Sequence, residues 1–285
     1  MTDWLFIDGS SLIFRAFHAL PRSIRAPDGT PVNATRGFLD NLSRLLRERG
    51  PRGLGVASDS DWRPAWRVAL IPSYKAHRVQ EPVPSELEPQ FPQIHAILAA
   101  AGVPFVGAAG FEAEDVIATW TDRAGEEAKI EIGSGDRDLF TLIRGERVRV
   151  LYPERGGLAV VDDGEVERRY GVPAHLYGDF AILRGDPSDG LPGLPGVGAK
   201  RAAELVIRHQ GLEGLLGSGV LRPEACDYLR RAEQVVRPRS DLDLELPPLI
   251  AQATTDADGA LELGRRWGAE GPVTRLLEIL TRIRS

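Results

Sequence analysis

Short apolar runs in this chain end repeatedly in an acidic residue. Trp4–Ile7 leads directly into Asp8, and Gly55–Ser58 leads directly into Asp59. Two later apolar runs are each followed, after a glycine-containing turn, by further acids. Short apolar runs that alternate with helical patterns are typical of buried strands in a parallel sheet. The sequence therefore predicts an α/β fold in which acids follow the carboxyl ends of the strands.

The carboxyl ends of parallel strands share one edge of a sheet, and that edge is where ligands bind. Acids brought together there raise one another's pKa unless a cation compensates for their charge. Because clustered oxygen ligands suit hard divalent ions, we predict a site for two or more Mg²⁺ or Mn²⁺ ions. The acids expected to converge are Asp8, Asp59, Glu112, Asp115, Asp136 and Asp138.

The spacing within each group of acids ranks the candidate ligands. Glu112 and Asp115 are three residues apart and share one face of a helix, whereas Glu114 points elsewhere and ranks below them. Asp136 and Asp138 lie on one side of an extended segment. A lone pair of acids is more often a helix cap, but several positions on one edge favour metal binding. The remaining candidate ligands are Asp186 and Asp189.

Composition places the chain among soluble globular proteins. Its 285 residues, 42% hydrophobic and 27% charged, are enough for one large domain or two smaller ones. No apolar run approaches the length of about 18 residues that a membrane-spanning helix needs. The first strand is expected within four residues of the N-terminus, which leaves no room for a signal peptide. The single cysteine, Cys226, excludes an internal disulfide, so we expect a cytoplasmic protein.

The net charge of −6 is unusual for a nucleic-acid-binding protein, but the acids are concentrated in the predicted metal site. Without the nine proposed ligands, the rest of the chain carries +3. Two acid-free basic segments, Ser10–Pro27 and Trp62–Gln80, each follow a proposed ligand. They are either solvated faces or DNA-contacting surfaces, and their position beside the acids favours DNA.

The chain divides by pattern into a sheet-containing part and a helical part. Strands are expected at 4–7, 53–58, 103–106, 129–132, 147–151 and 158–161, and helices at 10–20, 35–49, 85–101, 112–124 and 138–143. The basic segment 59–84 has no clean period and is expected to be a long loop or mobile arch. Two domains are predicted. Residues 1–172 contain the metal site and this arch, and residues 173–285 are helical.

A glycine-rich turn, Leu194–Arg201, lies in the helical part. Gly196 and Gly198 allow a tight turn with exposed backbone amides, and a helix is expected to follow. Amides at a helix N-terminus bind phosphate, and Lys200 adds a positive charge. This pattern predicts a helix-hairpin-helix turn that contacts the DNA backbone without reading its sequence. The alternative is a plain turn between helices.

Taken together, these motifs resemble the bacterial 5′-nuclease family, which comprises flap endonucleases and the N-terminal 5′–3′ exonuclease domain of DNA polymerase I. The matching motifs occur in the family's order and cover about residues 3–245. They are Asp8–Ser11 with Arg15–Ala19, Ser58–Asp59, Tyr74–Arg78, Glu112–Asp115, Gly135–Leu139, Gly185–Asp189 and Gly196–Lys200. Two positions depart from the family, which usually has aspartate at Glu114 and asparagine at Gly190.

The resemblance implies a PIN-like, mainly parallel sheet flanked by helices, a basic arch and a helical region with a helix-hairpin-helix turn. It implies 5′–3′ exonuclease and 5′-flap endonuclease activity on DNA, or on RNA primers, in replication and repair. Two ions would activate water and stabilise the leaving oxygen, while Lys75 and Arg78 grip the scissile phosphate. The implied DNA contacts are Arg15, Arg22, Arg67, Tyr74, His77, Gly196, Gly198, Lys200 and Arg201.

The resemblance also assigns the ions and the partners. The first ion would be held by Asp8, Asp59, Glu112 and Asp115, with Glu114 as a further candidate. Asp136 and Asp138 would lie between the ions, and Asp186 and Asp189 would complete the second. The family's hairpin often binds K⁺, which is a further candidate at Gly196–Lys200. Expected partners are DNA with a 5′ flap, a 5′ overhang or a nick, together with a replication or repair polymerase and a ligase. A monomer without an attached polymerase domain, and no membrane, are expected.

Two other functions fit part of the pattern. An RNA nuclease of the related PIN type shares the carboxylate-bearing sheet but lacks the helix-hairpin-helix turn, so Gly196–Lys200 argues against it. A non-catalytic DNA-junction binding protein needs no complete set of carboxylates, which would repel phosphate.

Overall fold

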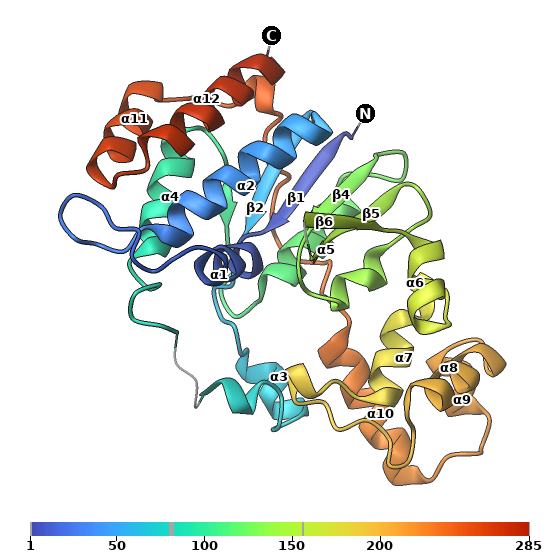
Figure 1. Cartoon of the computed structure of the whole chain (residues 1–285). Helices are drawn as coiled ribbons and strands as arrows, with labels where there is room; N and C mark the ends of the chain where they lie inside the picture. Colours follow the sequence, from blue (N-terminus) through green and yellow to red (C-terminus); the bar gives the residue numbers. More distant parts are fainter. Residues whose placement is uncertain (1, 80–82, 156, 285) are drawn as a thin grey trace.

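The computed structural model describes residues 2–79, 83–155 and 157–284 (Figure 1). A six-stranded sheet has the order β3-β2-β1-β4-β5-β6, with all neighbours parallel except β5 and β6. The strands are β1 (Trp4–Asp8), β2 (Gly53–Ala57), β3 (Phe105–Val106), β4 (Ile130–Gly133), β5 (Val148–Glu154) and β6 (Gly157–Val161). The α/β class and all six expected strands are confirmed.

The strand order changes direction beside β1. From β1 the chain builds β2 and β3 on one side, and it later returns to place β4 and β5 on the other. Such a change of direction opens a crevice at the carboxyl ends of the two central strands. Asp8 ends β1 in register with Ala57 of β2, and Gly133 ends β4 beside Ile7. The topology therefore brings the acids that follow β1, β2 and β4 to one crevice.

Alternate residues of β1 face two hydrophobic cores. Leu5 and Ile7 face the core formed with α1 (Gly9–Ala19), α2 (Asn33–Arg49), α4 (Gln90–Ala100) and α12 (Glu270–Arg284). Phe6 faces the core formed with α5 (Ala113–Arg123), α7 (Tyr177–Arg184), α8 (Ala199–Arg208), α9 (Leu212–Gly217) and α10 (Pro223–Val236). The second core is continuous from the sheet into the helical part of the chain.

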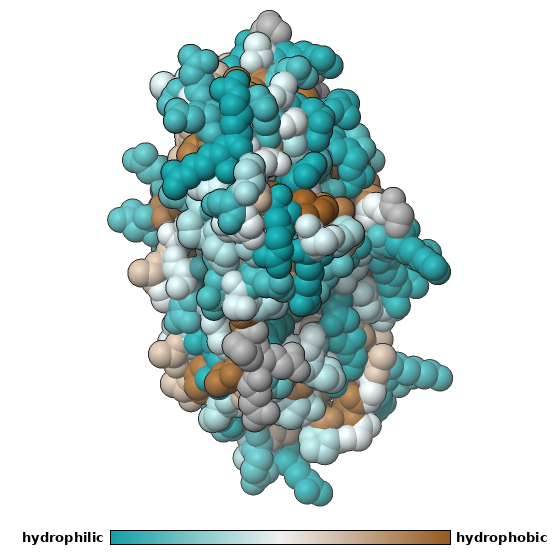
Figure 2. All heavy atoms as spheres, turned by 60° about the vertical axis from the view of Figure 1, so that its left-hand side comes forward, coloured by the Kyte–Doolittle hydropathy of each residue, from teal (hydrophilic) through white to brown (hydrophobic). Residues whose placement is uncertain are grey.

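The last two helices return to the first core. α11 (Ala257–Arg266) packs on α4, and α12 packs on α2, at the top left of Figure 1. The connection to them passes the sheet, where Leu249 bridges Gly53. The helical segment that follows residue 172 therefore does not pack as one separate group, and the division into two functional domains stays a prediction. Figure 2 shows that the side of the molecule turned forward there is mostly hydrophilic, with apolar side chains in small separate groups.

Several short helices were not expected from the sequence. α3 (Ala65–Leu70) and the 3-10 turn η1 (Ala76–Val79) lie in the predicted arch, of which residues 80–82 lie outside the described residues. α6 (Asp163–Tyr170) is capped by the Asp162 side chain and ended by left-handed Gly171. The expected helix at 138–143 is a 3-10 helix, η2 (Asp138–Leu142), and a further one is η4 (Pro187–Asp189). Within the described ranges, no helix is both long and apolar enough to cross a membrane.

The packing of α12 generates a stability prediction. Leu276 is buried in the first core, so Leu276→Ala should lower the free energy of unfolding by about 2–5 kcal/mol through lost contacts and a residual cavity. Glu278→Ala, at an exposed position of the same helix, should change it by less than about 0.5 kcal/mol. Urea unfolding of the full chain measures both variants. Equal losses would show that α12 is not part of this core.

Candidate metal centre

Three acids from different elements meet at the crevice. Carboxylate oxygens of Glu114, Asp136 and Asp138 all lie within 4.8 Å of one another. Glu114 lies in the first turn of α5, Asp136 follows β4, and Asp138 begins η2. The expectation that Glu114 points away from the other acids is therefore wrong, since it is Glu114 that joins this cluster; which acids of α5 bind an ion stays a prediction.

The start of α5 explains the reversal. Glu112 is the N-cap, with extended backbone, so it does not share a helical face with Asp115. The two residues form a capping box in which the Glu112 amide donates to an Asp115 carboxylate oxygen at 3.1 Å. Asp115 also accepts from the Arg239 amide and the Arg67 guanidinium, each at 2.8 Å. Both oxygens of Asp115 are thus occupied by protein donors.

Asp8 and Asp59 flank the cluster and are held by hydrogen bonds. Asp8 caps α1 by accepting from the Ser11 amide at 2.9 Å and accepts from the Ser134 hydroxyl at 2.5 Å. Asp59 accepts from the Ala113 amide at 2.8 Å, which ties the end of β2 to α5. Burial and the charge of Asp59 raise the pKa of Asp8 to about 7. Sequence reasoning missed Ser134, whose only signal is a hydroxyl residue between two glycines after β4.

The segment 62–79, hereafter the arch base, enters the crevice with cations. Glu112 accepts hydrogen bonds from Arg67, from Lys75 and, at 2.7 Å, from the Tyr74 hydroxyl. Arg67, Tyr74 and Lys75 are all buried. Arg67 and Tyr74 are therefore not at the surface where the expected DNA contacts would place them, because the carboxylates of α5 draw them inward. His77 and Arg78 remain exposed.

One member of the second pair of acids, Asp189, also contacts the arch base. Asp189 accepts from the Arg78 guanidinium at 2.9 Å, and its carbonyl accepts from the Lys75 amide at 2.9 Å. Asp186 is paired at 3.0 Å with Arg137, which lies between Asp136 and Asp138. The sequence did not predict this pair. Burial raises the pKa of Asp189 to about 6, with Lys75 opposing the shift. Asp189 therefore faces the same arch base as the α5 acids do, whereas Asp186 is held by Arg137.

Gly190, at the end of η4, allows the arch base to approach η4 closely. Its φ of 69° is left-handed, a conformation that asparagine also tolerates. A Cβ at this position would nevertheless lie 2.0 Å from the Ser73 carbonyl oxygen. The glycine at this departure from the family pattern is thus required by the contact between η4 and the arch base.

The cluster of three acids fits a divalent ion. Its donors are all carboxylate oxygens, as Mg²⁺ and Mn²⁺ prefer. One Glu114 oxygen lies 2.8 Å from Arg67 but forms no hydrogen bond, because the guanidinium N–H groups are not directed at it. Burial, and then the charge of Asp136, hold the pKa of Asp138 well above its usual range. Burial likewise raises the pKa of Glu114 despite Arg67. A bound divalent ion would supply positive charge against the desolvation and mutual repulsion that raise these pKa values.

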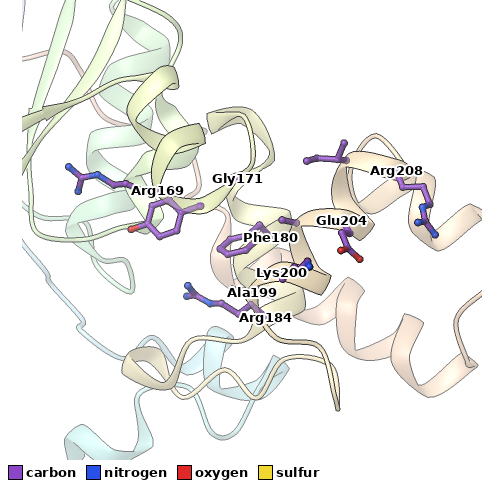
Figure 3. Close-up of a pocket in the computed structure, with 11 residues that line it drawn as sticks. Arg169, Gly171, Phe180, Arg184, Ala199, Lys200, Glu204 and Arg208 are labelled. Atoms are coloured by element: carbon purple, nitrogen blue, oxygen red, sulfur yellow. The ribbon is translucent and has the colours of Figure 1, made fainter.

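The glycine-rich turn lies away from this cluster at the start of α8. Gly196 is left-handed with a φ of 76°, and a Cβ at Gly196 or Gly198 would meet no atom within 4 Å. Next to it, a cavity of about 580 Å³ is lined by residues of α7, α8 and the end of α6. Figure 3 shows Arg184 and Phe180 from α7 and Lys200, Glu204 and Arg208 from α8 around this cavity. The turn therefore has open backbone beside a mainly basic surface.

The other expected DNA contacts have mixed surroundings. Arg15 is exposed and donates to the Glu154 carbonyl at 3.3 Å. Arg22 is paired with Glu86 at 3.4 Å, and Arg201 with Glu204 at 3.3 Å, in exposed positions. Weak exposed pairs of this kind are readily exchanged for phosphate. Their roles in DNA binding stay predictions.

Comparison with known proteins decides the family. Residues 3–171 match the family model described as the 5′-3′ exonuclease N-terminal resolvase-like domain. The chain belongs to the 5′-3′ exonuclease family. It is 45% identical to a 5′-3′ exonuclease of Streptomyces coelicolor, with 97% of this chain and 100% of that protein covered. A 5′-3′ exonuclease of Mycobacterium tuberculosis is 42% identical, with 97% of each covered.

Relatives within larger proteins and solved structures agree with this assignment. The chain is 38% identical to part of DNA polymerase I of Mycobacterium bovis, with 87% of this chain and 28% of the polymerase covered. Its fold is similar to that of the bacteriophage T5 flap endonuclease, with a TM-score of 0.67 at 18% identity over 98% of this chain and 99% of that one. The family that the motifs indicated is confirmed.

Raised carboxylate pKa values predict that metal binding depends on pH. A ligand must be deprotonated to bind a metal, so Mn²⁺ affinity should fall as the pH falls below about 7, the pKa of Asp8. The Asp8 pKa lies above its ordinary value of 3.8, so its charged form destabilises the metal-free fold. This loss of folding stability is absent below a pH of about 4, grows as the pH rises, and is complete above a pH of about 7.

Thermal unfolding in EDTA and in Mn²⁺ measures this dependence. Mn²⁺ should raise the melting temperature more at pH 8 than at pH 5.5, because more of the ligands are ionised at the higher pH. An equal increase at the two pH values would contradict the assignment of Asp8 to the metal centre.

The contact at Gly190 generates a matched comparison. Gly190→Ala and Gly196→Ala both place a side chain at a left-handed φ, but only the first meets the Ser73 carbonyl. Gly190→Ala should therefore lower the melting temperature further and increase proteolysis within 72–79. Differential scanning calorimetry and limited proteolysis measure the two effects. Equal behaviour of the variants would mean that η4 does not hold the arch base.

Proposed function

We propose that the protein is a divalent-metal-dependent 5′–3′ exonuclease and 5′-flap endonuclease that hydrolyses DNA phosphodiester bonds. The observation that carries the proposal is the meeting of Glu114, Asp136 and Asp138 at the crevice of a chain from this family. Asp8, Asp59, Asp186 and Asp189 border the crevice and are the further candidate ligands. Mg²⁺ and Mn²⁺ both suit this donor set.

The bound ions would lower the pKa of the attacking water and stabilise the leaving oxygen. The chain's own contribution is a pair of cations on the arch base. Burial alone would lower the pKa of the Lys75 ammonium, but Glu112 and Asp189 raise it above its usual value, so Lys75 stays protonated. Lys75 and Arg78 would then stabilise negative charge on a phosphate that enters between the arch base and the acids.

The proposed substrate is DNA with a 5′ flap, a 5′ overhang or a nick. The similar bacteriophage T5 flap endonuclease structure is a complex with DNA and metal ions, and the similar Rad2 catalytic core was determined with a DNA substrate. The turn Gly196–Lys200 would hold the duplex backbone, with K⁺ as a candidate ion there. A cytoplasmic monomer that acts with a polymerase and a ligase completes the proposal.

A labelled 5′-flap duplex tests the function. We expect cleavage at the flap junction, and release of nucleotides from a 5′ end, in Mg²⁺ or Mn²⁺ and none in excess EDTA. Equal cleavage in EDTA would refute metal-dependent hydrolysis. A labelled RNA hairpin in the same assay distinguishes a PIN-type RNA nuclease, which would cleave it in preference to DNA.

Asp136→Asn tests the cluster of three acids. The change removes a ligand and a charge that repels phosphate, so single-turnover cleavage should fall at least about a hundredfold while DNA affinity stays equal or rises. Asp258→Asn, an exposed acid on α11, should leave both quantities unchanged. Cleavage by Asp136→Asn at more than about a tenth of the normal rate would contradict the role of this ligand.

A further inference from the structure

Arg67 is a fully buried arginine on the arch base that the proposed mechanism leaves without a role. Its relative exposure is 0%. Its guanidinium contacts Glu112 and lies 2.8 Å from both Glu114 and Asp115. A single cation thus contacts every acid at the start of α5.

The surroundings of Arg67 fix it in this position. The guanidinium lies 4.8 Å from the Trp66 ring and 5.9 Å from the Tyr74 ring. Trp66 is itself anchored by its indole N–H, which donates to the Gly110 carbonyl at 3.1 Å just before α5. Arginine suits such a site because its planar fork matches carboxylates and stacks on aromatic rings. Arg67 is therefore held in place by its neighbours and is not a mobile surface cation.

The charge balance around Arg67 distinguishes the three acids. Glu112 is also contacted by Lys75 and Tyr74, and Asp115 by two backbone amides. Among the described residues no such additional donor reaches Glu114, and one of its buried oxygens makes no hydrogen bond. Glu114 is also the member that approaches Asp136 and Asp138. Protein donors thus hydrogen-bond both oxygens of Glu112 and of Asp115, whereas Glu114 shares the charge of Arg67 but keeps an oxygen without a hydrogen bond.

We propose that Arg67 is a positioning residue of the metal centre: a fixed counter-cation that offsets the charge of Glu112, Glu114 and Asp115 and leaves a Glu114 oxygen without a hydrogen bond, available to the divalent ion. The role rests on the metal centre of the proposed function but not on nuclease activity. An arginine at this point takes the place that a further divalent ion would otherwise occupy. Without it, three desolvated carboxylates face the crevice with Lys75 as their nearest remaining cation.

Mn²⁺ titration of the DNA-free protein tests the proposal. Arg67→Met should lower the melting temperature in EDTA and bind Mn²⁺ at least about tenfold more tightly, since a unit charge this close shifts binding by that order or more. Arg67→Lys keeps the charge without the planar fork, so its Mn²⁺ affinity should stay near that of the wild type. Calorimetric titration gives affinity and stoichiometry for each protein.

Arg63→Met is the matched control. Arg63 is also on the arch base, but its guanidinium donates to the backbone carbonyls of Tyr74, at 2.7 Å, and Pro72, at 3.0 Å. Its loss should weaken the arch base and leave Mn²⁺ affinity unchanged. If Arg67→Met lowers stability but binds Mn²⁺ with wild-type or weaker affinity, Arg67 is only structural and the proposal is wrong. If the wild type binds no Mn²⁺, the metal centre itself fails and this role fails with it.

A charge-balanced variant covers the case in which Arg67→Met does not fold in EDTA. Arg67→Met combined with Glu112→Gln removes one positive and one negative charge. Folding of the single variant only in Mn²⁺, or folding of the double variant when the single variant stays unfolded, supports the counter-cation role. Failure of both variants to fold with and without Mn²⁺ would overturn it, because loss of charge balance could not then be the cause.

Discussion

Mutual repulsion among desolvated carboxylates is the constraint on which the rest of this structure depends. Burial and neighbouring charge raise the pKa values of Asp8, Glu114, Asp138 and Asp189 together. Each element that reaches the crevice brings a donor against this repulsion, including the Ser11 amide at the start of α1 and the Ser134 hydroxyl after β4. The hydrogen-bond donors at this edge of the sheet therefore serve to hold together acids whose charges would otherwise drive them apart.

The arch base links this electrostatic problem to substrate access. Its cations contact the acids of α5 on one side, and Arg78 contacts Asp189 on the other. A phosphate that enters the crevice would compete with carboxylates for these cations, while bound metal ions would free the cations from the carboxylates. Metal binding and DNA binding are thus expected to support each other through the same side chains, without a long-range conformational path.

The sheet and the convergence of the acids could be predicted from the sequence, because strand period and parallel topology determine where strand ends meet. The choice among Glu112, Glu114 and Asp115 could not. It depends on whether Glu112 is the first helical residue or the N-cap, because a residue with extended backbone no longer shares a helical face with the residue three positions on. A boundary of this kind is settled by capping bonds, which a helical period does not reveal.

The burial of Arg67 and Tyr74 was hidden for another reason. Charged residues are almost never fully buried unless they are paired, and the acids that pair with Arg67 lie at least 45 positions away in the chain. A basic, acid-free segment therefore looks like a solvated surface until its partners are known. The contact at Gly190 is similar, since nothing local in the sequence reveals that Ser73 lies against it.

The return of α11 and α12 to the sheet has a mechanical consequence. Helices α7–α10, which carry the glycine-rich turn, share the second core with the sheet, and the chain enters them after α6 and returns to the sheet edge where Leu249 bridges Gly53 (Figure 1). They are held by this packing and by a chain connection at each end, so a swing of the turn relative to the acids must disturb the core and bend two connections at once. A duplex bound at that turn would then be held at a nearly fixed distance from the crevice, and that distance would set where along the strand cleavage occurs.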